Sequence, residues 1–112
     1  MRFAFLCFLA AGCAQPSDLE AEHAFVRRSG AITDTLEVGR VDSLVAFVNA
    51  DLLRGRLEWT LRDPDGTVTW TDAIEDSAGA RWATPDPARG AWRLVLEPDS
   101  AIGIAAVRLE AR

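Results

Sequence analysis

The chain has 112 residues, of which 49% are hydrophobic and 26% are charged, and its formal net charge is −5. This length suits one domain with a single core, and the composition is that of a globular protein rather than a disordered chain or a membrane bundle. All 12 basic residues are arginines and they are scattered along the chain. A partner that is a nucleic acid is therefore not expected, because phosphate binding needs a clustered basic surface.

Residues 1–12 have the layout of a secretory signal, in which one arginine precedes an apolar run of about ten residues. A helix needs about 20 residues to cross a bilayer, so we expect a signal helix that is removed and no lasting transmembrane anchor. The run ends in Leu9-Ala10-Ala11-Gly12-Cys13, which resembles the lipobox of bacterial lipoproteins. This resemblance implies cleavage after Gly12 and lipidation of Cys13. The alternative is an ordinary secretory signal beside a coincidental cysteine.

The two cysteines, Cys7 and Cys13, both lie in this N-terminal segment. The domain that follows therefore has no intramolecular disulfide and must be stabilised by its core. Several acyl chains hold a protein stably on a bilayer, so the lipobox implies a membrane-anchored protein of the cell envelope. Ala14 follows the cysteine, and the family rule that aspartate there retains a lipoprotein in the inner membrane does not apply. The resemblance thus favours the periplasmic face of the outer membrane.

Beyond the cysteine we expect a lipidated residue and polar tether at 13–22 and a folded domain at 23–112. In this second range, short alternating runs are separated by Gly, Pro and Asp, which predicts an all-β antiparallel sandwich of seven or eight short strands. The segment 42–53 also fits an amphipathic helix, but we favour a strand because valine and phenylalanine prefer β-structure. Further strands are expected at 24–28, 33–38, 91–97 and 102–109, the last with a bulge near Ala105.

The clearest element is a hairpin around Asp63-Pro64-Asp65-Gly66, a sequence typical of a type I turn. Residues 57–61 alternate apolar and polar side chains, and the alternation resumes after the turn. A four-residue loop would place Trp59 opposite Trp70 and bring the apolar side chains to one face, so we predict this register.

The segment Gly55–Gly66, taken with Gly90-Ala91-Trp92-Arg93-Leu94, resembles small jelly-roll domains of secreted bacterial proteins. The pattern is similar to that of pre-peptidase C-terminal domains, which combine a Gly-x-Leu-x-aromatic-x-Leu-x-Asp-Pro-x-Gly hairpin with a late Gly-x-Trp strand. The resemblance covers half of the folded part and implies a jelly-roll-like sandwich. It says more about fold than about function.

Four tryptophans, Trp59, Trp70, Trp82 and Trp92, stand out in a chain without tyrosine. Trp59, Trp70 and Trp92 are in phase with leucine and valine on their strands, which predicts core positions. Trp82 has no such apolar phase around it and is therefore the candidate contact for a ligand. Exposed aromatic rings on one face of a sandwich could stack on sugar rings.

An acidic group around the hairpin could offer oxygen ligands to Ca²⁺; its members are Asp63, Asp65, Asp72, Glu75 and Asp76. The first two are preferred turn residues and the spacing is not that of a calcium loop, so we predict no metal site and no cofactor. His23 is the only histidine, and no serine lies in a Gly-x-Ser-x-Gly motif. No catalytic residue is therefore predicted.

Three functions follow, from different classes. The leading hypothesis is a non-enzymatic, lipid-anchored β-sandwich of the cell envelope, which serves as a binding or structural module for an envelope partner. The first alternative is a carbohydrate-binding module, which requires at least two tryptophans exposed on one face. The second is a small hydrolase or metal-dependent enzyme, in which His23 would lie in a cleft beside an acid and a hydroxyl.

Overall fold

The computed structural model describes residues 17–112, and in this range it contains six strands and no helix. The strands, all paired antiparallel, are β1 (Ser17–Arg28), β2 (Ile32–Val38), β3 (Ser43–Arg62), β4 (Val68–Ile74), β5 (Ser77–Pro85) and β6 (Gly90–Ala111). The predicted all-β antiparallel fold is confirmed. The expected signal helix, the tether up to residue 16 and the lipidated Cys13 lie outside the described residues. Within residues 17–112 there is no helix that could span a membrane.

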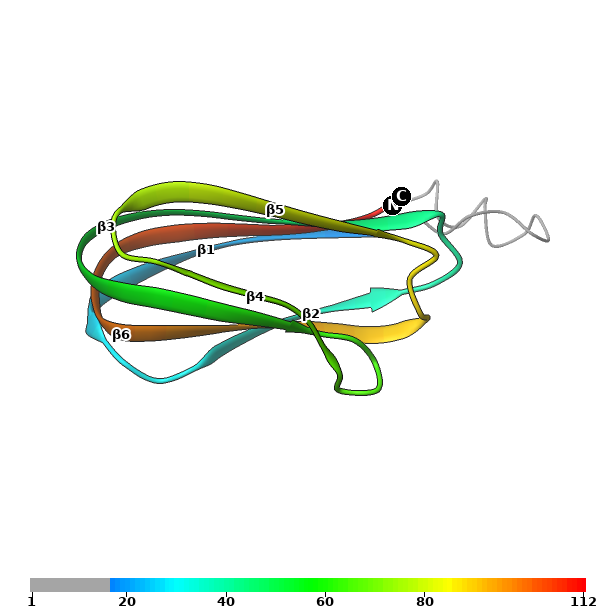
Figure 1. The fold of residues 1–112 in the computed structure, drawn as a ribbon, viewed down its shortest axis with the longest axis horizontal. Coiled ribbons are helices and arrows are strands. Elements are labelled where there is room, and N and C mark those ends of the chain that lie inside the picture. The colour runs from blue at the N-terminus through cyan, green and yellow to red at the C-terminus, as the bar shows by residue number, and fades with distance from the viewer. Residues whose placement is uncertain (1–16) are drawn as a thin grey trace.

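Two long strands join the two sheets of the sandwich (Figure 1). The upper sheet in that view contains β1, the second half of β6, the first half of β3 and β5, and the lower sheet contains β2, the first half of β6, the second half of β3 and β4. β3 has 20 residues and β6 has 22, so each is long enough to take part in both sheets. The strands predicted separately at 91–97 and 102–109 are the two halves of β6.

The bends at which β3 and β6 change sheets depend on glycine. Gly55 has a φ of +83°, and a Cβ atom there would lie 2.5 Å from the carbonyl oxygen of Ser100. Gly103 has a φ of +149°, and its Cβ would lie 2.2 Å from the carbonyl oxygen of Asp51. Residues with side chains rarely adopt such backbone angles, and these positions also leave no room for one. The two strands can therefore bend against each other only because both positions are glycine.

The bulge expected near Ala105 is a wrong prediction. Ala105 pairs in regular register with both of its neighbouring strands, and the irregular pairing on β6 lies at residues 99–102 instead. The mixed apolar pattern that suggested a bulge has another cause. Ile104 is 47% exposed on the outer face of the upper sheet, whereas Ala105 and Val107 face the core.

The core lies between the sheets and is built from alternate residues of every strand. In β3 the buried side chains repeat with a period of two, which confirms the strand favoured over a helix for 42–53. Burying side chains of this size stabilises the fold by about 1.5–3 kcal/mol each. The largest fully buried residues are Trp59, Phe25, Leu44, Leu57, Leu61, Leu94, Leu96, Leu109 and Val48.

The predicted hairpin exists, but its register differs from the expected one. Gly66 N donates to Asp63 O at 2.9 Å, which closes the expected turn. Trp59 lies opposite Asp72 rather than opposite Trp70, a shift of two residues. One comes from the loop, because Arg62 pairs with Val68 instead of Thr67, and the other from an extra residue in β4 at Thr69. The Thr69 hydroxyl donates to the carbonyl oxygen of Leu61 at 3.1 Å, which the alternation of apolar residues could not indicate.

β1 begins at Ser17, inside the stretch 13–22 that we expected to be a tether. Residues 17–22 pair with β6, so the boundary predicted at residue 23 lies too late. The physical reason is visible in the alternation of Leu19 and Ala21 with acidic residues, which continues the phase of the buried Phe25. An acidic outer face made this strand look like a polar linker.

Candidate functional site

The four tryptophans form one continuous row across the open side of the sandwich between β4 and β5. The ring centroids of Trp59 and Trp70 are 5.5 Å apart, those of Trp70 and Trp82 are 6.4 Å apart, and those of Trp82 and Trp92 are 6.2 Å apart. Trp70 and Trp82 are stacked with an interplanar angle of 13°, although they come from different sheets. The row therefore links the edges of both sheets.

This arrangement leaves no flat tryptophan face. Trp59 is 0% exposed and Trp92 is 3% exposed, as expected for core residues. Trp70 and Trp82 are half-buried and pack against the core. Trp82, the candidate ligand contact, thus has its ring between two other tryptophans, and its contact with a ligand stays a prediction. A carbohydrate site built on two exposed tryptophans does not fit this geometry.

His23 lies on the inner face of β1 and meets Asp34 of β2 across the other open side of the sandwich. Its Nε2 atom is 2.9 Å from Asp34 Oδ2, and both side chains are mostly buried. Within residues 17–112 no serine or threonine hydroxyl forms a hydrogen bond with His23. The acid expected for a catalytic triad is present, but the described residues do not bring a hydroxyl to it. The pair joins β1 to β2.

Three of the acidic residues around the hairpin accept hydrogen bonds from nearby groups of the chain. Asp63 Oδ1 accepts from the backbone N–H groups of Asp65 and Thr67, each at 2.9 Å. Asp72 accepts from the next backbone N–H, and Glu75 accepts from Arg56 at 3.4 Å. Among the described residues no group of three or more His, Cys, Asp or Glu side chains could hold a metal ion.

A groove that no sequence motif predicted crosses the outer face of the upper sheet. It consists of a hollow of about 240 Å³ that continues into a second one of about 370 Å³ along β1. The small side chain of Ala106 of β6 lies at its floor, level with Asn49 of β3 on one side and Glu22 of β1 on the other. We call this feature the outer groove; the residues that line it are Glu20, Ala21, Glu22, Phe47, Asn49, Ala106, Val107 and Arg108.

One side of the outer groove is held in place by β5. The guanidinium of Arg81 lies 5.8 Å from the centroid of the Phe47 ring, which is a cation–π contact. Asn49 lies over Gly79, where a Cβ atom would be 2.2 Å from Asn49 Oδ1. Arg108 reaches Glu20 of β1 at 3.7 Å on the other side. The groove therefore presents one aromatic ring, one amide, two carboxylates and the guanidinium of Arg108, and Arg81 lies beside it against Phe47.

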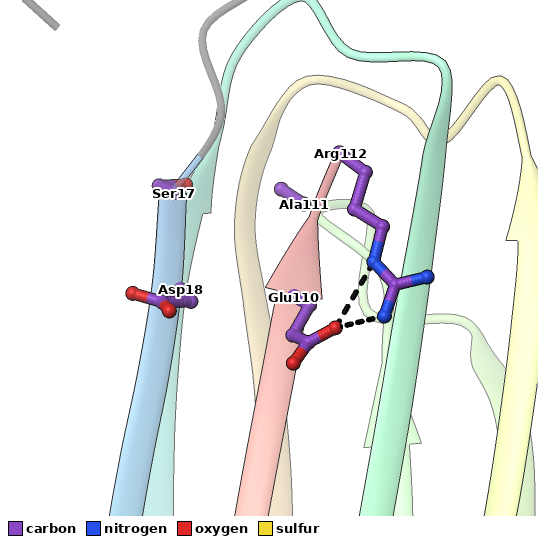
Figure 2. A pocket seen from close by; sticks show the side chains of 5 residues that line it. All are labelled: Ser17, Asp18, Glu110, Ala111 and Arg112. Carbon is purple, nitrogen blue, oxygen red and sulfur yellow. Dashed lines mark hydrogen bonds and ion pairs between the residues drawn. The ribbon is translucent and has the colours of Figure 1, made fainter. Parts of the chain in front are cut away.

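A separate open hollow lies at the end of the upper sheet, lined by the start of β1 and the end of β6. Figure 2 shows the Arg112 guanidinium folded toward Glu110, on the side of Glu110 away from Asp18. The hydrogen bond from Arg112 lowers the pKa of the Glu110 carboxyl below its ordinary value; partial burial opposes this, and the charge of Arg108 supports it. Arg108 and Arg112 both form ion pairs with Glu110. These three residues follow one another along the end of β6, and only the side chain of Arg108 also reaches another strand, at Glu20 of β1.

The alternation of residues in 42–53 indicates the outer groove, but only once this segment is assigned to a strand. Phe47 and Asn49 alternate with the buried Ala46 and Val48, so they face outward once 42–53 is a strand. As long as a helix remained an alternative, these two residues had no defined face. Their closeness to Arg108 also depends on pairing between strands 60 residues apart, which periodicity alone does not give.

No protein-family profile matches the chain, and no curated protein matches it either. Solved structures do. The pre-peptidase C-terminal domain of a collagenase from Bacillus anthracis superposes with a TM-score of 0.61 at 14% identity, over 82% of this chain and 88% of that one. A carbohydrate-binding module of Cellvibrio mixtus lichenase 5A, solved with cellotriose, gives 0.51 at 10% identity, over 87% of each chain. A protein of Bacillus endospore appendages, which form disulfide-linked pili, gives 0.50 at 11% identity, over 86% and 85%.

These similarities show the fold alone, because every identity is low. The chain is a jelly-roll-like β-sandwich. The similarity to a pre-peptidase C-terminal domain, expected from the hairpin and the late tryptophan strand, is confirmed at the level of the fold. Binding modules and structural domains share this architecture, so the choice of ligand must be argued from the residues on its surface.

Proposed function

We propose that this protein is a non-enzymatic binding module of the cell envelope, anchored by lipid on Cys13, and that its outer groove binds a carbohydrate chain. The observation on which the proposal rests is the combination of groups in the groove. A sugar ring has an apolar C–H face and a rim of hydroxyls. Phe47 offers a flat aromatic surface to the first, and Asn49, Glu20 and Arg108 offer acceptors and donors to the second.

The shape of the groove supports an extended ligand. The two hollows adjoin each other and share Glu20, Ala106 and Val107, so the depression continues from β3 across β6 to β1. The small side chain of Ala106 at its floor leaves room for a chain lying across the strands. The similarity in fold to carbohydrate-binding modules makes such a ligand reasonable and adds no residue to the argument.

The test is a binding titration with purified protein and soluble oligosaccharides, for which cellotriose and β-1,4-galactotriose are the first probes. Intrinsic tryptophan fluorescence and calorimetry would report binding. We expect Phe47→Ala to weaken binding at least about tenfold, since it removes the stacking surface, and Asn49→Ala to weaken it less.

Val95→Ala is the matched control, because Val95 lies on the central strand of the lower sheet with its side chain on the opposite outer face. It should bind like the unchanged protein. Equal binding by the Phe47 variant would remove the groove from the proposal. Failure of every oligosaccharide, together with retention of peptidoglycan-associated proteins in a cross-linking experiment, would favour a protein partner instead.

The anchor is tested separately. Metabolic labelling with a fatty acid analogue should label the unchanged protein and not the Cys13→Ser variant, since the thiol is the only acceptor that the lipobox resemblance implies. Cys7→Ser is the control and should be labelled normally. Labelling of the Cys13→Ser variant would contradict the anchor, whereas the groove proposal would be unaffected. Fractionation of the envelope would then tell the outer from the inner membrane.

A further inference from the structure

The end of the sandwich opposite Ser17 and Arg112 has an exposed aliphatic patch. Val26 is 83% exposed and Leu53 is 81% exposed, which is unusual for side chains of this kind, and Ile104 is 47% exposed. Val26 lies directly opposite Ile102 in the pairing of β1 with β6, and Leu53 lies at the irregular pairing of β3 with β6 beside the same residue. The register thus places Val26, Ile102 and Ile104 on the outer face of the upper sheet, with Leu53 at the adjacent bend. We call them the distal patch.

Arginines surround this patch without carboxylate partners. Arg27 and Arg28 follow Val26 in β1, and Arg54 follows Leu53 in β3. All three are exposed, and among the described residues none of them forms an ion pair. Arg56 nearby is different, since it pairs with Glu58 and Glu75. The distal end thus combines aliphatic side chains with free positive charge in a protein that is acidic overall.

Among the carboxylates at this end, Asp51 is held by a hydrogen bond from the Ser77 hydroxyl at 2.6 Å. Asp76 and Asp99 are exposed, and their side chains form no ion pair within residues 17–112. These three residues belong to β3, β6 and the turn between β4 and β5, whereas β1, on which Val26 lies, ends in Arg27 and Arg28.

We propose that the distal patch docks onto the surface of an anionic phospholipid bilayer. Exposed aliphatic side chains can enter the boundary between headgroups and acyl chains, and guanidinium groups beside them match lipid phosphates. The aliphatic side chains then contact the acyl-chain boundary, and the guanidinium groups contact the lipid phosphates. A purely apolar or purely acidic protein surface would not satisfy both groups. The docking requires neither the proposed lipid on Cys13 nor the outer groove.

The charge along the outer face sets the orientation. β1 presents Asp18, Glu20 and Glu22 outward near its start, then Val26, and ends in arginine. An anionic surface repels the first part of this face and attracts the last. Contact made through the patch alone therefore uses the distal end, with the Ser17 end turned away from the bilayer. A lipid on Cys13, four residues before Ser17, would hold the other end instead, so the two contacts are alternative orientations on one bilayer.

The test is co-sedimentation of the full chain, carrying Cys13→Ser in every sample, with vesicles of phosphatidylcholine with or without phosphatidylglycerol. The apolar segment at residues 1–12 is common to all samples, so differences between variants report the distal end. We expect binding only to vesicles that contain phosphatidylglycerol, weakened by added salt. The double variant Val26→Ser, Leu53→Ser should lose at least about tenfold in partitioning. Replacing Arg27, Arg28 and Arg54 by Gln should abolish the preference for phosphatidylglycerol.

Matched controls lie on the lower sheet. Val68→Ser changes a residue that is 45% exposed, and Arg93→Gln changes an exposed arginine of β6. Both should bind like the unchanged protein, and thermal melting confirms that each variant is folded. Equal vesicle binding by the double serine variant and the parent would overturn the proposal. So would a dimer in sedimentation equilibrium that the double variant converts to a monomer, because the patch would then belong to a second copy.

Discussion

At the scale of single residues, the two buried tryptophans Trp59 and Trp92 differ in whether their indole N–H has a hydrogen-bond partner. Trp59 is fully buried, and its Nε1 is the one buried side-chain polar atom without a hydrogen-bond partner among the described residues. Leaving such a donor unpaired costs about 1–3 kcal/mol. The indole is nevertheless retained, since its ring meets the edge of Trp70 and begins the row that closes the sandwich. Trp92, in contrast, donates to Ala88 O at 2.8 Å.

Glu110 allows a prediction about pH. Its pKa is lowered in the folded protein by the hydrogen bond from Arg112, so its ionised form stabilises the fold. This contribution is present above the ordinary carboxyl pKa of about 4.3 and is lost as the pH falls through the lower folded value. Glu110→Gln should therefore reduce the free energy of unfolding at neutral pH by about 0.5–1 kcal/mol, because both arginines are half exposed.

The measurement is urea unfolding of both proteins from neutral to acidic pH. The difference between them should shrink as the pH falls below the ordinary carboxyl pKa. Glu37→Gln is the control, since Glu37 is exposed on β2 and its side chain has no ion pair within residues 17–112. A difference that stays constant down to acid pH would mean that packing of the side chain, rather than its charge, stabilises this end of β6.

At the scale of elements, alternation gave the fold class and the inward-facing residues correctly wherever a strand has one polar face. Thr33–Val38 and Ala91–Glu97 lie in strands for this reason. The same rule failed where the polar face was strongly acidic, as in residues 17–22, and where both faces contain aliphatic residues, as around Ile104. In each case local composition obscured a regular period of two.

What the sequence could not supply were the relations between distant strands. The outer groove needs β1, β3 and β6 side by side, and the row of tryptophans needs β4 of one sheet to meet β5 of the other. One more residue in the loop and one extra residue at Thr69 were enough to change the hairpin register. These features depend on pairing and twist across the whole molecule, for which periodicity within one segment provides no information.

At the scale of the whole molecule, the sharing of strands should make the sandwich one cooperative unit. β3 and β6 each belong to both sheets, so neither sheet can open while the other remains paired. The tryptophans strengthen this link, because Trp82 of the upper sheet lies between Trp70 and Trp92 of the lower one. A substitution that destabilises one sheet should therefore destabilise the other to the same extent.

Leu109→Ala tests this coupling. Leu109 is 0% exposed and lies in the upper sheet, so its truncation should cost about 2–5 kcal/mol. Tryptophan fluorescence reports mainly on the lower sheet, where Trp59, Trp70 and Trp92 lie, and far-ultraviolet circular dichroism reports on both. We expect the denaturant midpoints of the two signals to fall together by the same amount. Ile104→Ala on the same strand, at a half-exposed position, should shift both only slightly. A fluorescence midpoint that stays in place while the circular dichroism midpoint falls would show that the sheets unfold separately, in spite of the strands they share.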